Sequence, residues 1–305
     1  MATKLSQMQS LGSIAGETEL EGLEAAPRIT PASHFEGREG FDAEFLQGLA
    51  VPFPKRTGPR QGDEAPVRGG GNVLKYEHFS VMMSKSRKIA IFTACNISGR
   101  KSRKIHRDKD VWAYDGRMDA KYQAGEELYA GNRLDRGHLV RREDPVWGAS
   151  AAIANDDTFH FTNCSPQYDS FNQQIWLGLE NYLLLNSRAH QLHISVFTGP
   201  VLRTSDMSYR GMKIPREYWK VVCLVTSQKR PSVTAYKISQ ANLLDDGLEF
   251  VFGKYKTYQI SVAKVEKDAH LEFGGLKDYD GFSNQEAVSG ADYARELTDW
   301  RQILI

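Results

Sequence analysis

The stretch Leu134-Asp135-Arg136-Gly137-His138-Leu139 carries the most information in this 305-residue sequence. A histidine titrates near neutral pH and can accept a proton from water. Arg136 can stabilise developing negative charge, or it can pair with an acid such as Asp135. A histidine in a glycine-flanked turn is more often an exposed or capping residue, so the role of His138 depends on the residues that accompany it.

Two later segments contain the other candidate site residues. Thr162–Gln167 reads TNCSPQ, and Phe171–Trp176 reads FNQQIW shortly before Glu180. An asparagine carbonyl oxygen is a hard, neutral ligand that suits Mg²⁺, which keeps several waters and needs few protein ligands. Asn172 opens a predicted helix, and Glu180 lies about two turns further along the same face. Asn172 could equally be only an N-cap, and Glu180 could be an exposed helix residue.

Taken together, these segments resemble the endonuclease G-like, sugar-non-specific DNA/RNA endonuclease family, and in particular a bacterial type of member. The resemblance spans about two thirds of the chain, roughly residues 76–273. It is carried by DRGHL at 135–139, DDTFHFTNCSPQ at 156–167, FNQQIWLGLE at 171–180, FTGP at 197–200 and KIPREYWK at 213–220.

The resemblance implies an α+β protein with a ββα-metal fold, in which a central antiparallel sheet is flanked by helices. A β-hairpin would deliver the histidine, and the following helix would deliver the asparagine. The cofactor would be Mg²⁺, with Mn²⁺ as a substitute. The family roles fall on His138 as general base, Asn172 as metal ligand, Glu180 as the acid that holds a metal-bound water, Asn163 and Arg136 near the scissile phosphate, and Arg117 in YDGR as the candidate for an upstream arginine.

The implied function is hydrolysis of phosphodiester bonds in DNA and RNA with little sequence preference, because the expected contacts are to the phosphate backbone. Two alternatives remain open. One is a catalytically idle nucleic-acid-binding protein, against which the joint presence of His138, Asn172 and Glu180 argues. The other is a regulated effector or toxin nuclease, which differs in biology rather than in chemistry.

Composition is that of an ordinary globular protein, with 41% hydrophobic residues, 25% charged residues and a net charge of +1. Nine basic residues against one acid lie between Lys85 and Lys109. This cluster suits a phosphate backbone, although it could also be a solvated loop. Three widely spaced cysteines predict buried free thiols rather than disulfides or a zinc site.

The chain contains no apolar run of membrane-spanning length, so no contact with a membrane is expected. The first residues lack the pattern of a secretory signal, which predicts a cytoplasmic protein or export by a signal-independent route.

Residues 1–71 differ in composition from residues 72–305, which we take as the endonuclease domain. The first segment has a net charge of −3, and residues 51–71 are rich in proline, glycine and charge. We expect an N-terminal arm or linker that is poorly ordered or packs on the body, and that has a regulatory role. A regulatory partner or inhibitor could contact it, and the chain could form a homodimer.

Apolar periodicity predicts the main elements. A hairpin is expected from Phe79–Met83 and Ile89–Asn96, and an amphipathic helix from Asn172–Ser187. Further strands are expected at His193–Gly199, Trp219–Thr226 and Val233–Ile238. Short helices are expected at Gly40–Leu49 and Ala291–Leu297.

Overall fold

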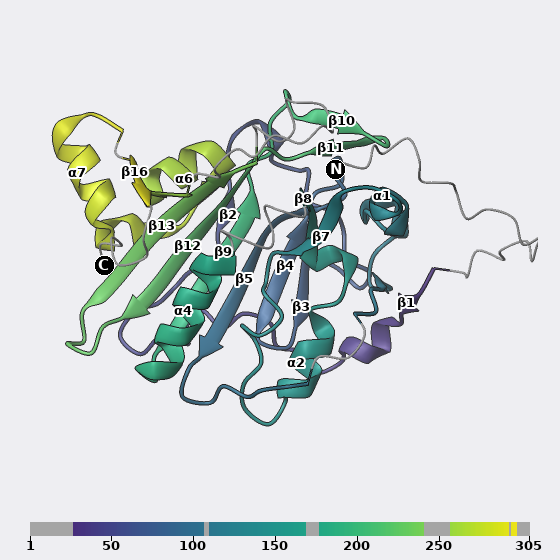
Figure 1. The fold of residues 1–305 in the computed structure, drawn as a ribbon, viewed down its shortest axis with the longest axis horizontal. Helices are drawn as coiled ribbons and strands as arrows, with labels where there is room; N and C mark the ends of the chain where they lie inside the picture. Colours follow the sequence, from purple (N-terminus) through teal and green to yellow (C-terminus); the bar gives the residue numbers. More distant parts are fainter. Residues whose placement is uncertain (1–26, 107–109, 169–176, 241–256, 293, 298–305) are drawn as a thin grey trace, which may run out of the picture.

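The structure, a computed structural model, describes residues 27–106, 110–168, 177–240, 257–292 and 294–297. Its centre is an eight-stranded sheet in the order β16-β14-β13-β12-β9-β5-β4-β3 (Figure 1). All neighbouring strands of this sheet are antiparallel. Its strands are β3 (Val73–Tyr76), β4 (Phe79–Met83), β5 (Ala90–Ser98), β9 (His193–Pro200), β12 (Glu217–Val225), β13 (Pro231–Ser239), β14 (Thr257–Ile260) and β16 (Ala294–Leu297).

The middle strands are buried on both faces, which explains their nearly continuous apolar runs. On β12, Tyr218 and Val222 belong to one core cluster, whereas Trp219, Val221 and Cys223 belong to the other. This alternation follows from the two-residue period of a strand. The α+β class, the antiparallel sheet and the hairpin β4–β5 are therefore as predicted.

Helix α4 (Leu177–Ala189) lies across one face of the sheet (Figure 1). Its Leu179 and Leu184 are buried in the same cluster as Tyr218. The opposite face is covered by α6 (Val262–Ala269), the 3₁₀ helix η7 (Gly274–Tyr279) and the segment 41–53, which contribute to the second cluster. The described part of the predicted helix 172–187 is thus confirmed, and its first residues lie outside the described part of the chain.

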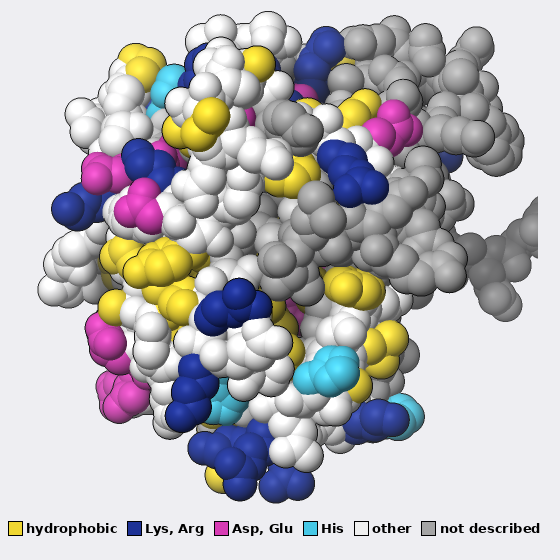
Figure 2. Space-filling model, turned by 90° about the vertical axis from the view of Figure 1, so that its left-hand side faces the viewer, with side chains coloured by type: hydrophobic (Ala, Val, Ile, Leu, Met, Phe, Trp, Pro, Cys, Tyr) yellow, Lys and Arg dark blue, Asp and Glu magenta, His cyan; other side chains and the backbone are white. Residues whose placement is uncertain are grey.

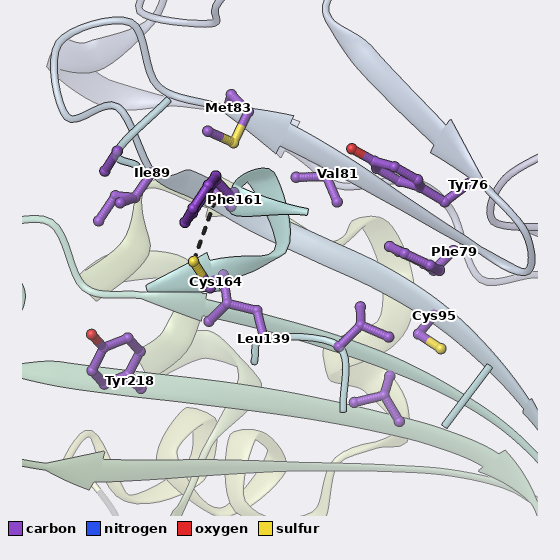
Figure 3. Close-up of a cluster of buried hydrophobic side chains, with 14 of the residues drawn as sticks. Tyr76, Phe79, Val81, Met83, Ile89, Cys95, Leu139, Phe161, Cys164 and Tyr218 are labelled. Carbon is purple, nitrogen blue, oxygen red and sulfur yellow. Dashed lines mark hydrogen bonds between the residues drawn. The ribbon is translucent and has the colours of Figure 1, made fainter. Parts of the chain in front are cut away.

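A separate two-stranded antiparallel ribbon packs on the same core cluster as α4. It consists of β7 (Leu134–His138) and β8 (Cys164–Tyr168). The chain between them contains α2 (Ala151–Asp157) and the 3₁₀ helix η5 (Phe161–Asn163). Leu139, Phe161 and Cys164 pack into the core beside β4 and β5, and the Cys164 thiol donates to the carbonyl of Phe161 at 3.6 Å (Figure 3).

Short elements complete the described fold. They are β1 (Ile29–Thr30), η2 (Ala32–Phe35), β2 (Lys55–Arg56), η3 (Gly58–Arg60), β6 (Tyr114–Asp115), η4 (Ala120–Tyr122), α1 (Glu126–Tyr129), β10 (Met207–Tyr209), β11 (Met212–Ile214), β15 (Leu271–Glu272) and α7 (Gly281–Ser289).

Residues 27–71 pack on the body of the protein. Strand β1 pairs with β6, and β2 pairs with β15. Five of these residues are buried in the two core clusters: Phe35, Leu46, Leu49, Val51 and Ala65. This segment is therefore part of the hydrophobic core, and the division of the chain at residue 71 stays a prediction.

Two predicted helices are wrong. Residues 40–49 form turns, although Leu46 and Leu49 still face the core. Gly40 has φ +82°, and a Cβ there would lie 2.4 Å from Ser80 Oγ, so this position favours glycine in a turn. At the other end of the chain, Ala294–Leu297 forms the edge strand β16, because its backbone pairs with β14.

The three cysteines are buried and free, as predicted. Within the described residues, no helix is long and apolar enough to cross a membrane. Basic side chains gather toward the lower edge of the face in Figure 2. Of the predicted basic cluster, Arg100, Lys101, Arg103 and Lys104 are exposed. Arg87 is instead buried, where it pairs with Asp206.

Candidate active site

His138 is the last residue of β7, opposite Cys164 of β8. Its half-buried ring packs against two aromatic side chains that also contact each other, with centroids 4.8 Å from Trp112 and 5.3 Å from Phe159. The Phe159 ring meets it edge-on at 84°. These rings restrict the orientation of the imidazole and limit the water around it, so the histidine is held on a rigid ribbon in a partly apolar setting.

Asn163 fixes the turn that follows His138. The residue is fully buried, and its Oδ1 accepts a hydrogen bond from the Val140 amide at 2.9 Å. Its Nδ2 donates to the carbonyls of Val140 and Thr158 at 3.0 and 3.1 Å. Both amide protons are therefore engaged by backbone oxygens. These contacts give Asn163 a positioning role for the turn after His138, and the predicted place near the scissile phosphate stays a prediction.

Gly137 separates Arg136 from His138 for a steric reason. A Cβ at this position would lie 2.1 Å from the Oε1 atom of the buried Gln167 on β8. The backbone of β7 can approach this side chain only because residue 137 is glycine. The glycine in the DRGH motif therefore allows the close approach of the ribbon that carries the histidine.

Arg136 lies two residues before His138, so the alternation of a strand places both side chains on the same face of β7. Its guanidinium forms an ion pair with Glu126 of α1, and its Cζ lies 5.3 Å from the centroid of the Tyr129 ring. The side chain is about a quarter exposed. It is thus held beside the histidine while part of it still faces solvent.

Glu180 on α4 is connected to the histidine segment through a buried lysine. Lys220, on the central strand β12, is 1% exposed, and its Nζ lies 3.1 Å from Glu180 Oε1. The same ammonium donates to Thr198 Oγ1 at 2.9 Å and to the carbonyl of Leu139 at 3.5 Å. Leu139 directly follows His138, so Lys220 joins α4, the sheet and the end of β7.

Lys220 ends the KIPREYWK segment, but sequence reasoning gave it no role. The available signal was a lysine in the middle of an otherwise apolar run, YWKVVCLV. A lysine is almost never fully buried unless it is paired. Its partners come from three segments that are distant in sequence. The sequence can therefore indicate that the lysine is buried and paired, but not which residues it pairs with.

A second buried carboxyl, Asp144, lies close to this group. Burial raises its pKa to about 7, and the nearby Glu180 carboxylate contributes to the rise, whereas Arg141 and Lys220 oppose it. Arg141 also donates to Asn181 Oδ1 of α4 at 2.8 Å. The end of β7 and helix α4 therefore meet over a group of buried charges.

This pKa predicts a pH-dependent stability. The folded-state pKa of Asp144 lies above its ordinary value of 3.8, so the folded protein holds the proton more tightly than the unfolded chain. Stability should therefore fall as pH rises from about 4 to about 7, by up to about 1.4 kcal/mol per pKa unit. Urea unfolding in EDTA at pH 5 and pH 8 measures this effect. Asp144→Asn should flatten the dependence, and equal pH dependence of both proteins would contradict the assignment.

Arg117, the candidate upstream arginine, belongs to a different cluster. Its guanidinium is bound by Asp115, with Nη2 2.7 Å from Oδ2, and it donates to the carbonyl of Lys75. Its Cζ lies 3.7 Å from the centroid of the Phe35 ring and 4.6 Å from that of Tyr76. These contacts attach η2 to the body, so the structure does not group Arg117 with His138.

Asn172 lies outside the described residues. Within the described part of the chain, no group of three or more His, Cys, Asp or Glu side chains could hold a metal ion. The metal donors predicted from the resemblance are the amide oxygen of Asn172 and the carboxylate of Glu180, and the described Glu180 pairs with Lys220. Both predicted donors are oxygen atoms, the type of ligand that Mg²⁺ and Mn²⁺ prefer.

Comparisons with known proteins identify the family of this chain. The model of the DNA/RNA non-specific endonuclease family matches residues 56–280. Uncharacterized protein y4fB of Sinorhizobium fredii is 39% identical over 292 residues, which cover 88% of this chain but only 43% of that relative. Mitochondrial endonuclease G of Bos taurus is 30% identical over 243 residues, which cover 67% of this chain and 77% of the relative. The chain thus spans less than half the length of y4fB.

A solved structure supports the fold. The crystal structure of the EndoG/EndoGI complex superposes with a TM-score of 0.53 at 15% identity, covering 66% of this chain and 84% of that one. The sheet, the β7–β8 ribbon and the helix α4, which follows the ribbon in the chain, match the class of ββα-metal nucleases. The chain belongs to the DNA/RNA non-specific endonuclease family. Dependence on a divalent metal ion is general in this family.

Proposed function

We propose that this chain is a magnesium-dependent endonuclease that hydrolyses phosphodiester bonds in DNA and RNA with little sequence preference. The observation that carries the proposal is the half-buried His138 on the β7–β8 ribbon, joined through Lys220 to the helix that carries Glu180. This arrangement connects the segment that carries the proposed general base to the helix that carries the proposed acid.

In the proposed mechanism, His138 accepts a proton from a water molecule as that water attacks phosphorus in line with the leaving 3′ oxygen. Arg136 stabilises the negative charge that develops on the phosphate oxygens. Asn172 would hold the metal ion directly, and Glu180 would hold it through water. A bound Mg²⁺ or Mn²⁺ would supply Lewis-acid stabilisation of the phosphate and the leaving oxygen. The products would carry a 5′-phosphate and a 3′-hydroxyl.

We expect the wild-type protein to cleave both a supercoiled plasmid and a structured RNA with Mg²⁺ or Mn²⁺, and to lose both activities in EDTA. Cleavage should also weaken steeply between about 50 and 200 mM salt, because phosphate contacts release counterions. Gel assays of both substrates measure this. Undiminished cleavage in EDTA would overturn the metal dependence, whereas binding without cleavage under any metal would favour the idle binder.

Regulation is a further part of the proposal. The solved EndoG/EndoGI complex concerns the mechanism by which EndoG is inhibited. A cytoplasmic non-specific nuclease would need similar restraint, so we propose a regulatory partner or inhibitor that contacts residues 1–71, as in a regulated effector or toxin. A homodimer and signal-independent export also remain proposals. Truncation at residue 71 is a poor test, because it removes buried core residues such as Phe35 and Val51.

A further inference from the structure

Basic side chains gather where three connections meet at one end of the central sheet. Ile194 of β9 is the register partner of both Ile97 of β5 and Leu224 of β12, so these strands are level there. The connections at this end are 99–106, 188–192 and 226–230. They contain no Asp or Glu and carry seven Lys or Arg residues, which we call the basic end of the sheet: Arg100, Lys101, Arg103, Lys104, Arg188, Lys229 and Arg230. Strand β5 points toward the lower edge of Figure 1, and Lys and Arg side chains gather at the lower edge of Figure 2.

Most charges of the basic end are not neutralised by the fold. All its members except Arg188 are exposed. In the part of the chain that the structure describes, none of the exposed members forms an ion pair. Arg188 is paired, with its Nη2 3.0 Å from Glu143 Oε2. Like charges that are held together repel one another, and a bound polyanion would relieve this repulsion.

The first of the three connections is fixed by its backbone. The Gly99 amide donates to the carbonyl of Leu192 at 2.8 Å, and the Arg103 amide donates to the carbonyl of Val146 at 2.9 Å. A Cβ on Gly99 would lie 1.9 Å from the carbonyl oxygen of Ser187, so only glycine lets this loop begin against the end of α4. The backbone is therefore already ordered while the basic side chains face solvent, which lowers the entropic cost of binding.

The basic end is wide enough for several phosphates. Strands β5 and β13 are three strand spacings apart in the sheet order β13-β12-β9-β5, which corresponds to about 14 Å. One strand of a B-form duplex rises about 3.4 Å per phosphate, so about four phosphates match this width.

The basic end is also linked to the segment that carries His138. Arg142 Nη1 donates to the carbonyl of Ile105, in the first connection, at 3.3 Å. Arg142 follows His138 by four residues, so their Cα atoms are at most about 15 Å apart. One turn of duplex is about 34 Å long, which exceeds this separation.

We propose that the basic end is a second contact surface for nucleic acid, which binds the phosphate backbone of a duplex outside the cleavage site. This inference rests on the proposed function for the identity of the partner. The surface adds affinity for long substrates and contributes part of the salt dependence of binding, whereas the chemical step at His138 proceeds without it.

The test is binding of a fluorescein-labelled duplex of about 30 base pairs, or about three helical turns, measured by fluorescence anisotropy. The proteins carry His138→Ala and are kept in EDTA, and gels confirm that the duplex stays intact. Arg103→Gln/Lys104→Gln and Lys229→Gln/Arg230→Gln should each raise the Kd by at least about tenfold at about 100 mM salt. Each pair should also make the slope of log Kd against log salt shallower by about two, and both pairs together by about four.

Two controls have matched chemistry. Arg103→Lys/Lys104→Arg keeps both charges and should bind like the parent protein. Lys55→Gln/Lys267→Gln removes two exposed lysines from β2 and α6, which lie toward the other end of the sheet in Figure 1. It should change the Kd by less than about twofold, because salt screens charges more than about 10 Å from the bound phosphates.

Variants of the basic end that share the Kd and the salt slope of the Lys55→Gln/Lys267→Gln control would overturn the surface, as would a loss from only one of the two connections. With His138 present, single-turnover cleavage at saturating DNA should keep the wild-type rate in every variant. A slower rate at saturation would place these residues in the cleavage step and contradict the proposal. Because binding is measured without cleavage, the surface can be confirmed while the nuclease activity fails, and the reverse.

Discussion

Replacing His138 by alanine should reduce cleavage of plasmid DNA and of RNA together, by about 10²–10⁴-fold, the usual contribution of a general base. Both substrates should lose activity to the same degree, because the same proton transfer starts either reaction. The measurement is the single-turnover cleavage rate on each substrate with saturating Mg²⁺. The affinity of the variant for nucleic acid should remain close to that of the wild type, since the phosphate contacts come from other residues.

His190→Ala provides the matched control. This exposed histidine directly follows α4, and its described hydrogen bond joins its backbone amide to the carbonyl of Asn186. It should cleave at the wild-type rate. A His138→Ala protein that cleaves as fast as His190→Ala would remove the histidine from the mechanism. A variant that loses RNA cleavage while it keeps DNA cleavage would show that the two substrates do not share one base.

Sequence patterns predicted the central sheet well, because strands buried on both faces leave long apolar runs with few charges. The hairpin β4–β5 and the strands β9, β12 and β13 were all found from such runs. The edge strand β16 was mistaken for a helix, since its four residues are mostly exposed and only pairing with β14 makes them a strand. The local apolar pattern therefore predicts strands that are buried along their length. It fails for a short exposed strand that forms only because its backbone pairs with a distant segment.

The N-terminal segment shows the same limit. Residues 27–71 have little apolar periodicity, and their short strands pair with segments far along the chain, at Tyr114 and at Leu271. Long-range pairs of two residues leave no local signal. The sequence was equally limited in predicting what each site residue does. His138 and Asn163 were found through the resemblance, but only the structure reveals that the amide of Asn163 is engaged by the backbone around the histidine.

The role of Lys220 could not be predicted from the sequence, and its replacement is the second change with a large expected effect. Lys220→Met should lower the free energy of unfolding by about 3–5 kcal/mol, because it leaves the Glu180 carboxylate buried beside Asp144 without its counter-charge. Cleavage should fall as well, since the bond from Nζ to the Leu139 carbonyl is lost next to His138. Urea unfolding in EDTA and cleavage rates with Mg²⁺ measure the two effects separately.

Two further proteins distinguish a positioning role from general packing. Lys237→Met on the neighbouring strand β13 removes a lysine that is 20% exposed and paired with Glu217 at 3.1 Å, and a pair of that kind contributes about 0–1 kcal/mol. The double variant Lys220→Met/Glu180→Gln removes the unpaired charge, so it should recover much of the lost stability. It should not recover cleavage, because neither the link to Leu139 nor the carboxylate returns. If the double variant instead regained full activity, the ion pair would serve stability alone, and the geometry of His138 would not depend on it.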